Sequence, residues 1–341
     1  MRKATTLREV AEEAGVSVST VSRALNDQPF VRTEVRDRVL IASAALGYRP
    51  DVAARSMRTG TTGAVGLIVS DISNPLFAAV ARAADSMLSP LGYALMIANS
   101  ANDPAHEAEL MRAFRQRRLD GLILAAADES ATGLSERMRD FNASVLLDRD
   151  VPGTRSDAVL SDHEAGLADA LRHLFSLGHR RVALIAGTTA QRGSRVRIRR
   201  YHEELEVMGL DFEPDLCIGE QMTIEDGYRS CCRVLDLAKP PTAIIAANNQ
   251  VFAGLFAAIR DRGIQVPRDL SIIACEETDL TALHNPPLDV VERDMGALGR
   301  SAAELLISRI GSPGRAPRTV VLPTMFHSRG SSAGPRNRGA V

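Results

Sequence analysis

The sequence predicts a chain of two parts: a small all-α helix-turn-helix domain, followed by an α/β core of two lobes, each built on a parallel, doubly wound sheet. Three observations predict this. The first fifty residues contain two short amphipathic helix patterns separated by a glycine. From about residue 64 onward, buried-strand patterns alternate with amphipathic helices, and this cycle runs twice. A chain of 341 residues is also too long for a single hydrophobic core.

The helix-turn-helix pattern begins with a capping box. Thr6, followed three residues later by Glu9, predicts that a helix begins at the next position. Gly15 is the predicted stop, because glycine adopts the left-handed backbone of a helix end at little cost. Ser17 is a good cap for a second helix. A third helix is predicted over residues 33–46, and it would complete a small core.

In such a motif the N-terminal residues of the second helix face the bases of the major groove. Val18 offers an apolar surface to a thymine methyl group, and Ser19 can donate or accept a hydrogen bond. Arg23, one turn further on, can bind a guanine with both ends of its guanidinium. The same pattern also fits a helical hairpin that packs against another part of a protein. The choice between these two interpretations depends on the residues that follow.

Charge and composition fit a DNA-binding N-terminus on a protein without a membrane segment. Residues 1–60 hold ten Arg or Lys against seven Asp or Glu, whereas the remainder holds 31 against 35. The chain lacks the apolar core of a signal peptide and any run of about twenty apolar residues. The four cysteines lack metal-ligand spacing and fit small apolar positions in a reducing compartment. We therefore expect a cytoplasmic protein without membrane contact, metal or cofactor.

The block LGYRPDVAARSMRTG, from Leu46 to Gly60, follows the third predicted helix. With this block the chain closely resembles the LacI (lactose repressor)/GalR family of bacterial transcription factors, over about residues 5 to 328. The resemblance implies a hinge helix that is disordered without operator DNA and folds in the minor groove as a pair. Met57 stands where the family has a leucine that wedges between base pairs, a role that methionine can also fill. A plain polar linker is the alternative interpretation.

The resemblance also implies a domain organisation. The expected segments are a DNA-binding domain at 1–48, a hinge at 49–61, an effector-binding core at 62–327 and a disordered tail at 328–341. The core would resemble a periplasmic sugar-binding protein, with lobes made of about 62–160 plus 292–323, and of about 161–290. The tail is rich in Gly, Ser, Pro and Arg, a composition typical of disorder. A homodimer through the core is expected, because one helix-turn-helix contacts only half of an operator.

The expected contacts with double-stranded operator DNA come from the helix-turn-helix and the hinge. They combine polar side chains of the second helix with positions that the resemblance implies. The full set is Thr6, Ser17, Val18, Ser19, Thr20, Ser22, Arg23, Asn26, Tyr48, Ala54 and Met57.

A small-molecule effector is expected in a cleft between the lobes. Ligands of doubly wound sheets bind beyond the carboxyl ends of the strands, and in two lobes these ends face each other. Family motifs at these strand ends imply that the effector is bound by Asp71, Phe77, Asp148, Arg197, Met222, Asn249 and Glu276. For Phe77, a role in the hydrophobic core is the alternative. Asp162 also matches a family position, but we interpret it as a helix cap.

Three of these positions depart from the family pattern and bear on the effector's charge. Asn249 replaces an aspartate that usually grips sugar hydroxyls, Glu276 lies in an altered motif, and Met222 replaces an aromatic of some members. A neutral Asn249 beside Arg197 would tolerate an anion, whose oxygens a guanidinium binds in pairs. We therefore hypothesise a carbohydrate-like effector that is acidic or phosphorylated. Glu276 argues the other way if it faces the cleft.

The implied mechanism is allosteric repression, in which closure of the cleft changes the spacing of two hinge segments and thereby operator affinity. Induction and co-repression fit equally well. Control by a partner protein, with a degenerate cleft, is one alternative, and a sugar-binding protein without a DNA role is another. An enzyme is not expected, because the seven histidines are scattered and the chain lacks a Gly-rich phosphate loop or a Ser/His/Asp grouping.

Overall fold

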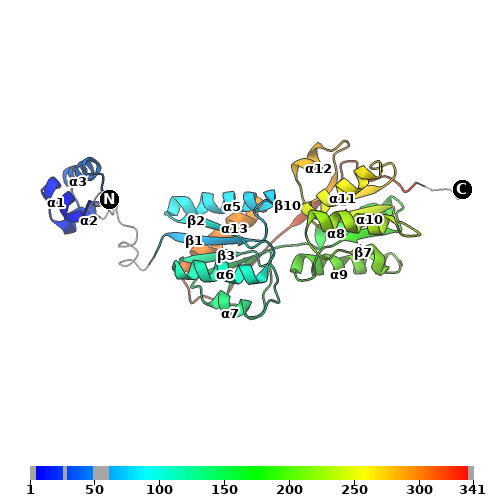
Figure 1. Cartoon of the computed structure of the whole chain (residues 1–341), viewed down its shortest axis with the longest axis horizontal. Helices are drawn as coiled ribbons and strands as arrows, with labels where there is room; N and C mark the ends of the chain where they lie inside the picture. The colour runs from blue at the N-terminus through cyan, green and yellow to red at the C-terminus, as the bar shows by residue number, and fades with distance from the viewer. Residues whose placement is uncertain (1–4, 26–28, 49–60, 337–341) are drawn as a thin grey trace. The chain divides into compact units, whose positions relative to one another are not determined.

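The computed structural model describes residues 5–25, 29–48 and 61–336. The chain divides into two units, residues 1–62 and residues 63–341 (Figure 1). The first unit is helical and the second is an α/β core, which confirms the predicted fold class. Three of the expected DNA contacts, Asn26, Ala54 and Met57, lie outside the described residues. No helix within the described ranges is long and apolar enough to cross a bilayer.

The described part of the first unit contains α1 (Leu7–Ala14), α2 (Val18–Leu25) and α3 (Thr33–Ala45). The predicted capping box is present, since the Thr6 hydroxyl accepts from Glu9 N at 3.4 Å and the Glu9 carboxylate accepts from Thr6 N at 2.7 Å. Gly15 has a φ of 64°, in the left-handed region where glycine carries no steric cost. Each helix buries a valine completely, and these are Val10, Val21 and Val39.

The first lobe of the core is a six-stranded parallel sheet in the order β11-β5-β4-β3-β1-β2. Its strands are β1 (Ala64–Val69), β2 (Ala94–Asn99), β3 (Gly121–Leu124), β4 (Ser144–Leu147), β5 (Asp157–Ser161) and β11 (Thr319–Leu322). Its helices are α5 (Pro75–Leu88), the 3-10 turn η1 (Ser89–Leu91), α6 (Pro104–Gln116), α7 (Leu134–Arg139) and α13 (Met295–Gly311).

Strand periodicity explains why this first sheet is covered on both faces. Successive side chains of a strand point to opposite sides, so Leu67 packs with α5 and α13 whereas Ile68 packs with α6 and α7. Strands buried on both faces read as unbroken apolar runs, which is the pattern that the sequence carries. The carboxyl ends of the strands are therefore the open edge of the lobe.

The second lobe repeats this arrangement, with strand order β12-β10-β9-β8-β6-β7 (Figure 1). Its strands are β6 (Val182–Ile185), β7 (Cys217–Ile218), β8 (Ala243–Ala246), β9 (Ser271–Ala274), β10 (Asp289–Arg293) and β12 (Thr324–His327). Its helices are α8 (Ala165–Ser176), α9 (Arg192–Val207), the 3-10 turn η2 (Pro214–Leu216), α10 (Ile224–Leu235), α11 (Asn249–Asp261) and α12 (Asp279–Leu283). One face packs against α10 and α11, and the other against α8 and α9.

The second sheet corrects two expectations. It is not entirely parallel, because β12 pairs with β10 in antiparallel register. The chain also changes lobes three times within residues 61–336, after β5, after β10 and after β11, whereas the sequence predicts two crossings. The sequence did not predict β12 because it is a four-residue strand at a sheet edge. Three of its residues are exposed or partly exposed, so its hydrophobic pattern is too short to identify a strand.

The segment 328–336, predicted to be disordered, packs on the second lobe. The buried Asp289 carboxylate accepts the backbone N–H groups of residues 329–331 at 2.6, 2.8 and 3.3 Å. The Ser331 hydroxyl donates to the carbonyl of Ile272 at 2.6 Å and accepts from the N–H of Asp289 at 2.7 Å. The composition is that of a loose tail, but a distant carboxylate supplies the hydrogen bonds that order it.

Replacing Ser331 by alanine should lower the free energy of unfolding of the core by about 1–3 kcal/mol, because two buried backbone groups would lose their partner. Urea unfolding followed by circular dichroism measures the change. Ser328→Ala, at an exposed position in the same segment, is the matched control and should leave the midpoint unchanged. Equal midpoints for both variants would contradict this anchoring role.

Candidate functional site

One side of α2 carries the side chains predicted to face the bases. Val18, Ser19 and Arg23 are exposed, and Val18 is 42% exposed, which is unusual for a valine in a domain with a core of its own. Val21 and Ala24, on the opposite side of the helix, are buried among the three helices. The helical period of 3.6 residues therefore separates a packed side from a free side, as a reading helix requires.

The remaining described positions of the expected DNA contacts have structural roles as well. Ser17 accepts from Thr20 N at 3.2 Å, so it caps α2 as predicted. Thr6 caps α1 and stays exposed, and Ser22 is half-buried. Tyr48 packs against the three-helix core. Contact of any of these residues with DNA remains a prediction.

Polar and charged side chains line a cleft between the two lobes. Its cavity volume is about 80 Å³, and it lies where the carboxyl ends of the strands of both sheets meet. Six of the seven residues predicted to bind an effector line it, namely Asp71, Phe77, Asp148, Arg197, Met222 and Glu276. Phe77 also packs against the core of the first lobe, so both interpretations of that residue apply.

The seventh residue, Asn249, is placed differently. Its side-chain amide exchanges two hydrogen bonds with that of Asn74, at 3.1 and 3.2 Å, and so joins the lobes. Sequence reasoning missed several lining residues, among them His163, Asn248, Gln250 and Arg293. The signal that could have found Arg293 is its position directly at the end of a strand, in a segment interpreted only as a crossing. Asp162, predicted to be a helix cap, lies two residues before Glu164, the N-cap of α8, and its carboxylate accepts from Glu164 N at 3.0 Å.

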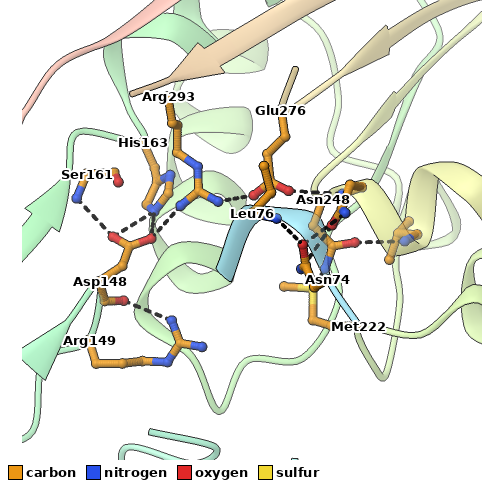
Figure 2. Close-up of polar contacts among 12 residues, drawn as sticks. Asn74, Leu76, Asp148, Arg149, Ser161, His163, Met222, Asn248, Glu276 and Arg293 are labelled. Atoms are coloured by element: carbon orange, nitrogen blue, oxygen red, sulfur yellow. Dashed lines mark hydrogen bonds and ion pairs between the residues drawn. The ribbon is translucent and has the colours of Figure 1, made fainter. Parts of the chain in front are cut away.

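Asp148 is the centre of the polar contacts in the cleft (Figure 2). It follows β4 with a φ of 53°, a left-handed conformation that aspartate tolerates better than most residues. Its carboxylate accepts from Ser161 N at 2.9 Å, His163 Nε2 at 3.0 Å and Arg293 Nη1 at 2.6 Å. Burial would raise the pKa of Asp148, but His163 and Arg293 hold that pKa well below its usual range. Asp148 is therefore an ionised, buried acceptor.

Arg293 lies between two carboxylates, as Figure 2 shows. Its other terminal nitrogen donates to the carboxylate of Glu276, which is itself 4% exposed. Glu276 also accepts from Asn249 N at 3.1 Å. Burial lowers the pKa of Arg293 to about 10, which leaves the guanidinium charged at neutral pH. The bridge connects Asp148, at the end of a first-lobe strand, with Glu276, at the end of a second-lobe strand.

Arg197 has a different environment. This residue of α9 is 5% exposed, lines the cleft and hydrogen-bonds the sulfur of Cys275. Among the described residues, no carboxylate forms an ion pair with it. Arg149 is also buried, but it donates to the carbonyls of Ala126 at 2.7 Å and Asp148 at 3.0 Å. Arg197 is thus the cleft guanidinium most available to an anion.

Hydrogen bonds between side chains of the two lobes lie beside the cleft. Asp71 accepts from the amide of Gln250, and Asn74 pairs with Asn249, so α5 and α11 are tied together near their N-termini. Hydrogen bonds of this kind are individually weak in net terms, about 0.5–1.5 kcal/mol.

Burial shifts the pKa values of two groups in opposite directions, that of His163 downward and that of Glu107 upward. Burial, together with the positive charge of Arg197, lowers the pKa of His163 to about 4. Burial raises the pKa of Glu107, on α6, to about 7, although its carboxylate accepts from Ala127 N at 2.8 Å. Between about pH 4.5 and 6.5 the unfolded chain binds the extra proton at His163, whereas the native chain binds it at Glu107. The two effects on stability oppose each other.

Glu107→Gln should therefore make the protein lose more stability on acidification than the wild type does. The native proton at residue 107 disappears, and the His163 contribution, which is complete above pH 6.5 and is lost as the pH falls towards 4, is then unopposed. The added loss is roughly 1 kcal/mol per pH unit in this range. Urea midpoints between pH 7.5 and 4.5 measure it. A variant as insensitive to pH as the wild type would contradict it, and His163→Gln should shift the dependence the other way.

Two families of known proteins match the chain. The description "Bacterial regulatory proteins, lacI family" matches residues 6–51, and "Periplasmic binding protein-like domain" matches residues 171–332. The chain is 30% identical over 332 residues to the HTH-type transcriptional regulator DegA of Bacillus subtilis, covering 96% of this chain and 98% of that protein. It is 29% identical to the HTH-type transcriptional repressor PurR of Haemophilus influenzae, covering 89% and 91%.

Solved structures agree with this relationship. A complex of the transcriptional regulator CelR with cellobiose is 27% identical, with a TM-score of 0.72 and coverage of 96% and 99%. A LacI family regulator from Enterococcus faecium with bound ribose is 28% identical, with a TM-score of 0.70 and coverage of 80% and 100%. The Lac repressor dimer bound to operator, at 24% identity and a TM-score of 0.85, has the same fold. The chain belongs to the LacI/GalR family and is a DNA-binding transcriptional regulator, not an enzyme.

Proposed function

We propose that this regulator is a dimeric repressor whose affinity for operator DNA is switched by a small, carbohydrate-like effector in the interlobe cleft. The observation that carries the proposal is the cleft itself, where strand ends of both lobes place buried, charged side chains around one cavity. Its relatives include a regulator complexed with cellobiose and another with bound ribose. Since its DNA target lies in the bacterial cytoplasm, we propose that the protein acts there.

The charges in the cleft favour an acidic or phosphorylated effector over a neutral sugar. Glu276, the residue that argued for a neutral ligand, has its negative charge matched by Arg293. Asn249 brings no charge, and Arg197 has no carboxylate partner among the described residues. A buried cation without a counter-ion is costly, and an anionic ligand would remove that cost. Carboxylate and phosphate oxygens match the planar guanidinium geometry.

Exposed apolar side chains support a homodimer formed through the core. The edge strand β2 and the turn before it expose Leu91, Met96 and Ile97, and α12 exposes Leu280 and Leu283, the latter at 84%. Apolar groups that monomers would leave in water are typical of subunit contacts. A two-fold dimer would also present two copies of α2 to a two-fold operator.

The switch would act through the relative positions of the lobes. Bonds such as Asp71–Gln250 and Asn74–Asn249 exist only when the lobes are close, and an effector in the cleft would add contacts to both sides. An effector can shift this equilibrium by as much as its affinity differs between the two arrangements. Residues 49–60, the expected hinge, lie outside the described residues, so its folding on DNA remains a prediction.

The effector prediction is tested on operator DNA. Fluorescence anisotropy with an operator selected from a random-sequence pool should show that D-gluconate or D-glucose 6-phosphate, unlike D-glucose, changes operator affinity by about fivefold or more. Arg197→Ala should abolish the response while DNA binding persists. Arg199→Ala, on the same helix but paired with Glu164, is the matched control. Responses to neutral sugars alone would contradict the anionic class, and a response only to a partner protein would contradict the effector cleft.

Arg23→Ala should weaken binding to the selected operator by about 1–3 kcal/mol and relax the preference at one base pair, because a forked contact with a base edge would be lost. Repeating the selection with the variant protein measures the preference directly. A uniform loss on every DNA sequence, with a salt slope reduced by about one, would instead mean that Arg23 contacts only phosphate.

A further inference from the structure

Arg293 stands between the two carboxylates that a polyhydroxyl ligand would use, Asp148 and Glu276 (Figure 2). We propose that Arg293 is the residue that determines the class of effector: it withdraws both carboxylates from ligand binding and thereby makes the cleft selective for anions. This inference rests on the proposed effector cleft and identifies the residue that sets its specificity.

Both carboxylate oxygens of Asp148 accept hydrogen bonds from the protein. One carboxylate oxygen accepts from Ser161 N at 2.9 Å and from His163 Nε2 at 3.2 Å. The other accepts from His163 Nε2 at 3.0 Å and from Arg293 Nη1 at 2.6 Å. Three N–H donors thus reach Asp148, with that of His163 shared between both oxygens, so a ligand hydroxyl would have to compete with Arg293 and His163 for this carboxylate.

Glu276 is held in the same way. One carboxylate oxygen accepts from Arg293 and the other from Asn249 N at 3.1 Å. The backbone of Glu276 has a φ of 143°, in a region that residues other than glycine rarely adopt. Such a strained conformation persists only where the surroundings compensate for it. The contacts with Arg293 and Asn249 are the compensation that the structure provides.

The two buried guanidiniums of the cleft therefore have different roles. Arg293 pairs with protein carboxylates, whereas Arg197 is available to a ligand. Arg293 donates from each of its terminal nitrogens to a protein carboxylate, so its positive charge is already matched by two negative charges. Arg197 has a thiol as its partner and lines the same cleft. Without Arg293, two carboxylates would face the ligand instead, and the cleft would repel anions and accept hydroxyl groups.

Two variants test this with opposite expected shifts. Arg293→Gln removes the positive charge, frees acceptor positions on Asp148 and Glu276, and should reduce the affinity for D-glucose 6-phosphate and inorganic sulfate about tenfold or more. It should also create measurable D-glucose binding. Glu276→Gln keeps an acceptor for Asn249 N but leaves Arg293 with one carboxylate fewer, and should strengthen binding of the same anions about threefold or more.

Isothermal titration calorimetry of the full-length protein measures these affinities in a chloride buffer of constant ionic strength. Arg300→Gln, an exposed arginine on α13, is the control and should behave as wild type. Circular dichroism checks the fold of each variant. Because removal of one partner from a buried ion pair is costly, Glu276→Gln keeps the inference testable if Arg293→Gln does not fold.

The possible outcomes separate this inference from the function on which it rests. Wild-type binding of anions, with opposite shifts in the two variants, supports it. Wild-type binding of anions that neither Arg293→Gln nor Glu276→Gln changes would overturn the role of Arg293 and leave the anionic effector standing. Wild-type binding of D-glucose with no anion bound would overturn both.

Discussion

The buried ion pairs of Arg293 are the contact on which the arrangement of the core depends. Asp148 ends a strand of one sheet, Glu276 ends a strand of the other, and Arg293 is the last residue of the strand by which the chain leaves the second lobe. A buried charge is costly unless it has a counter-ion and its polar atoms have hydrogen-bond partners. The three side chains meet that condition together, and none of them would meet it alone.

This arrangement determines which hydrogen-bonding groups of the cleft are available to a ligand. Asp148 and Glu276 are ionised but already bonded, His163 is neutral because its pKa is lowered to about 4, and Asn249 spends its amide on Asn74. The cleft therefore holds charges and dipoles but offers few free acceptors. Under the proposed function, a ligand with acceptor oxygens, such as a carboxylate or phosphate, would bind in this cleft better than a ligand that offers only hydroxyl donors. The positive charge of Arg197 would likewise favour an anionic ligand over a neutral one.

The helix-turn-helix unit follows a simpler logic. Its core is made of small and branched aliphatic side chains from three helices, so the rest of α2 is free to be polar and exposed. Val18, Ser19 and Arg23 share that free side because residues one, four and five positions apart lie within the same half of a helix. The unit has a hydrophobic core of its own, made by residues of its three helices.

Local chemistry determined much of what could be predicted from the chain. The capping box at Thr6, the glycine stop at Gly15 and the alternation of strands and helices involve residues close in sequence. The strand-end rule predicted a cleft, and the family resemblance assigned Asp71, Asp148 and Arg197 to it. Only the tertiary structure decided the partners: Arg293 with Asp148, 145 positions earlier, Asn249 with Asn74, and Asp289 with a tail that composition assigned to disorder. A sequence pattern records which side chains carry charge or hydrogen-bonding groups. Which of these groups neutralise one another, and which stay available to a ligand, depends on distances between residues far apart in the chain, and those exist only in the folded protein.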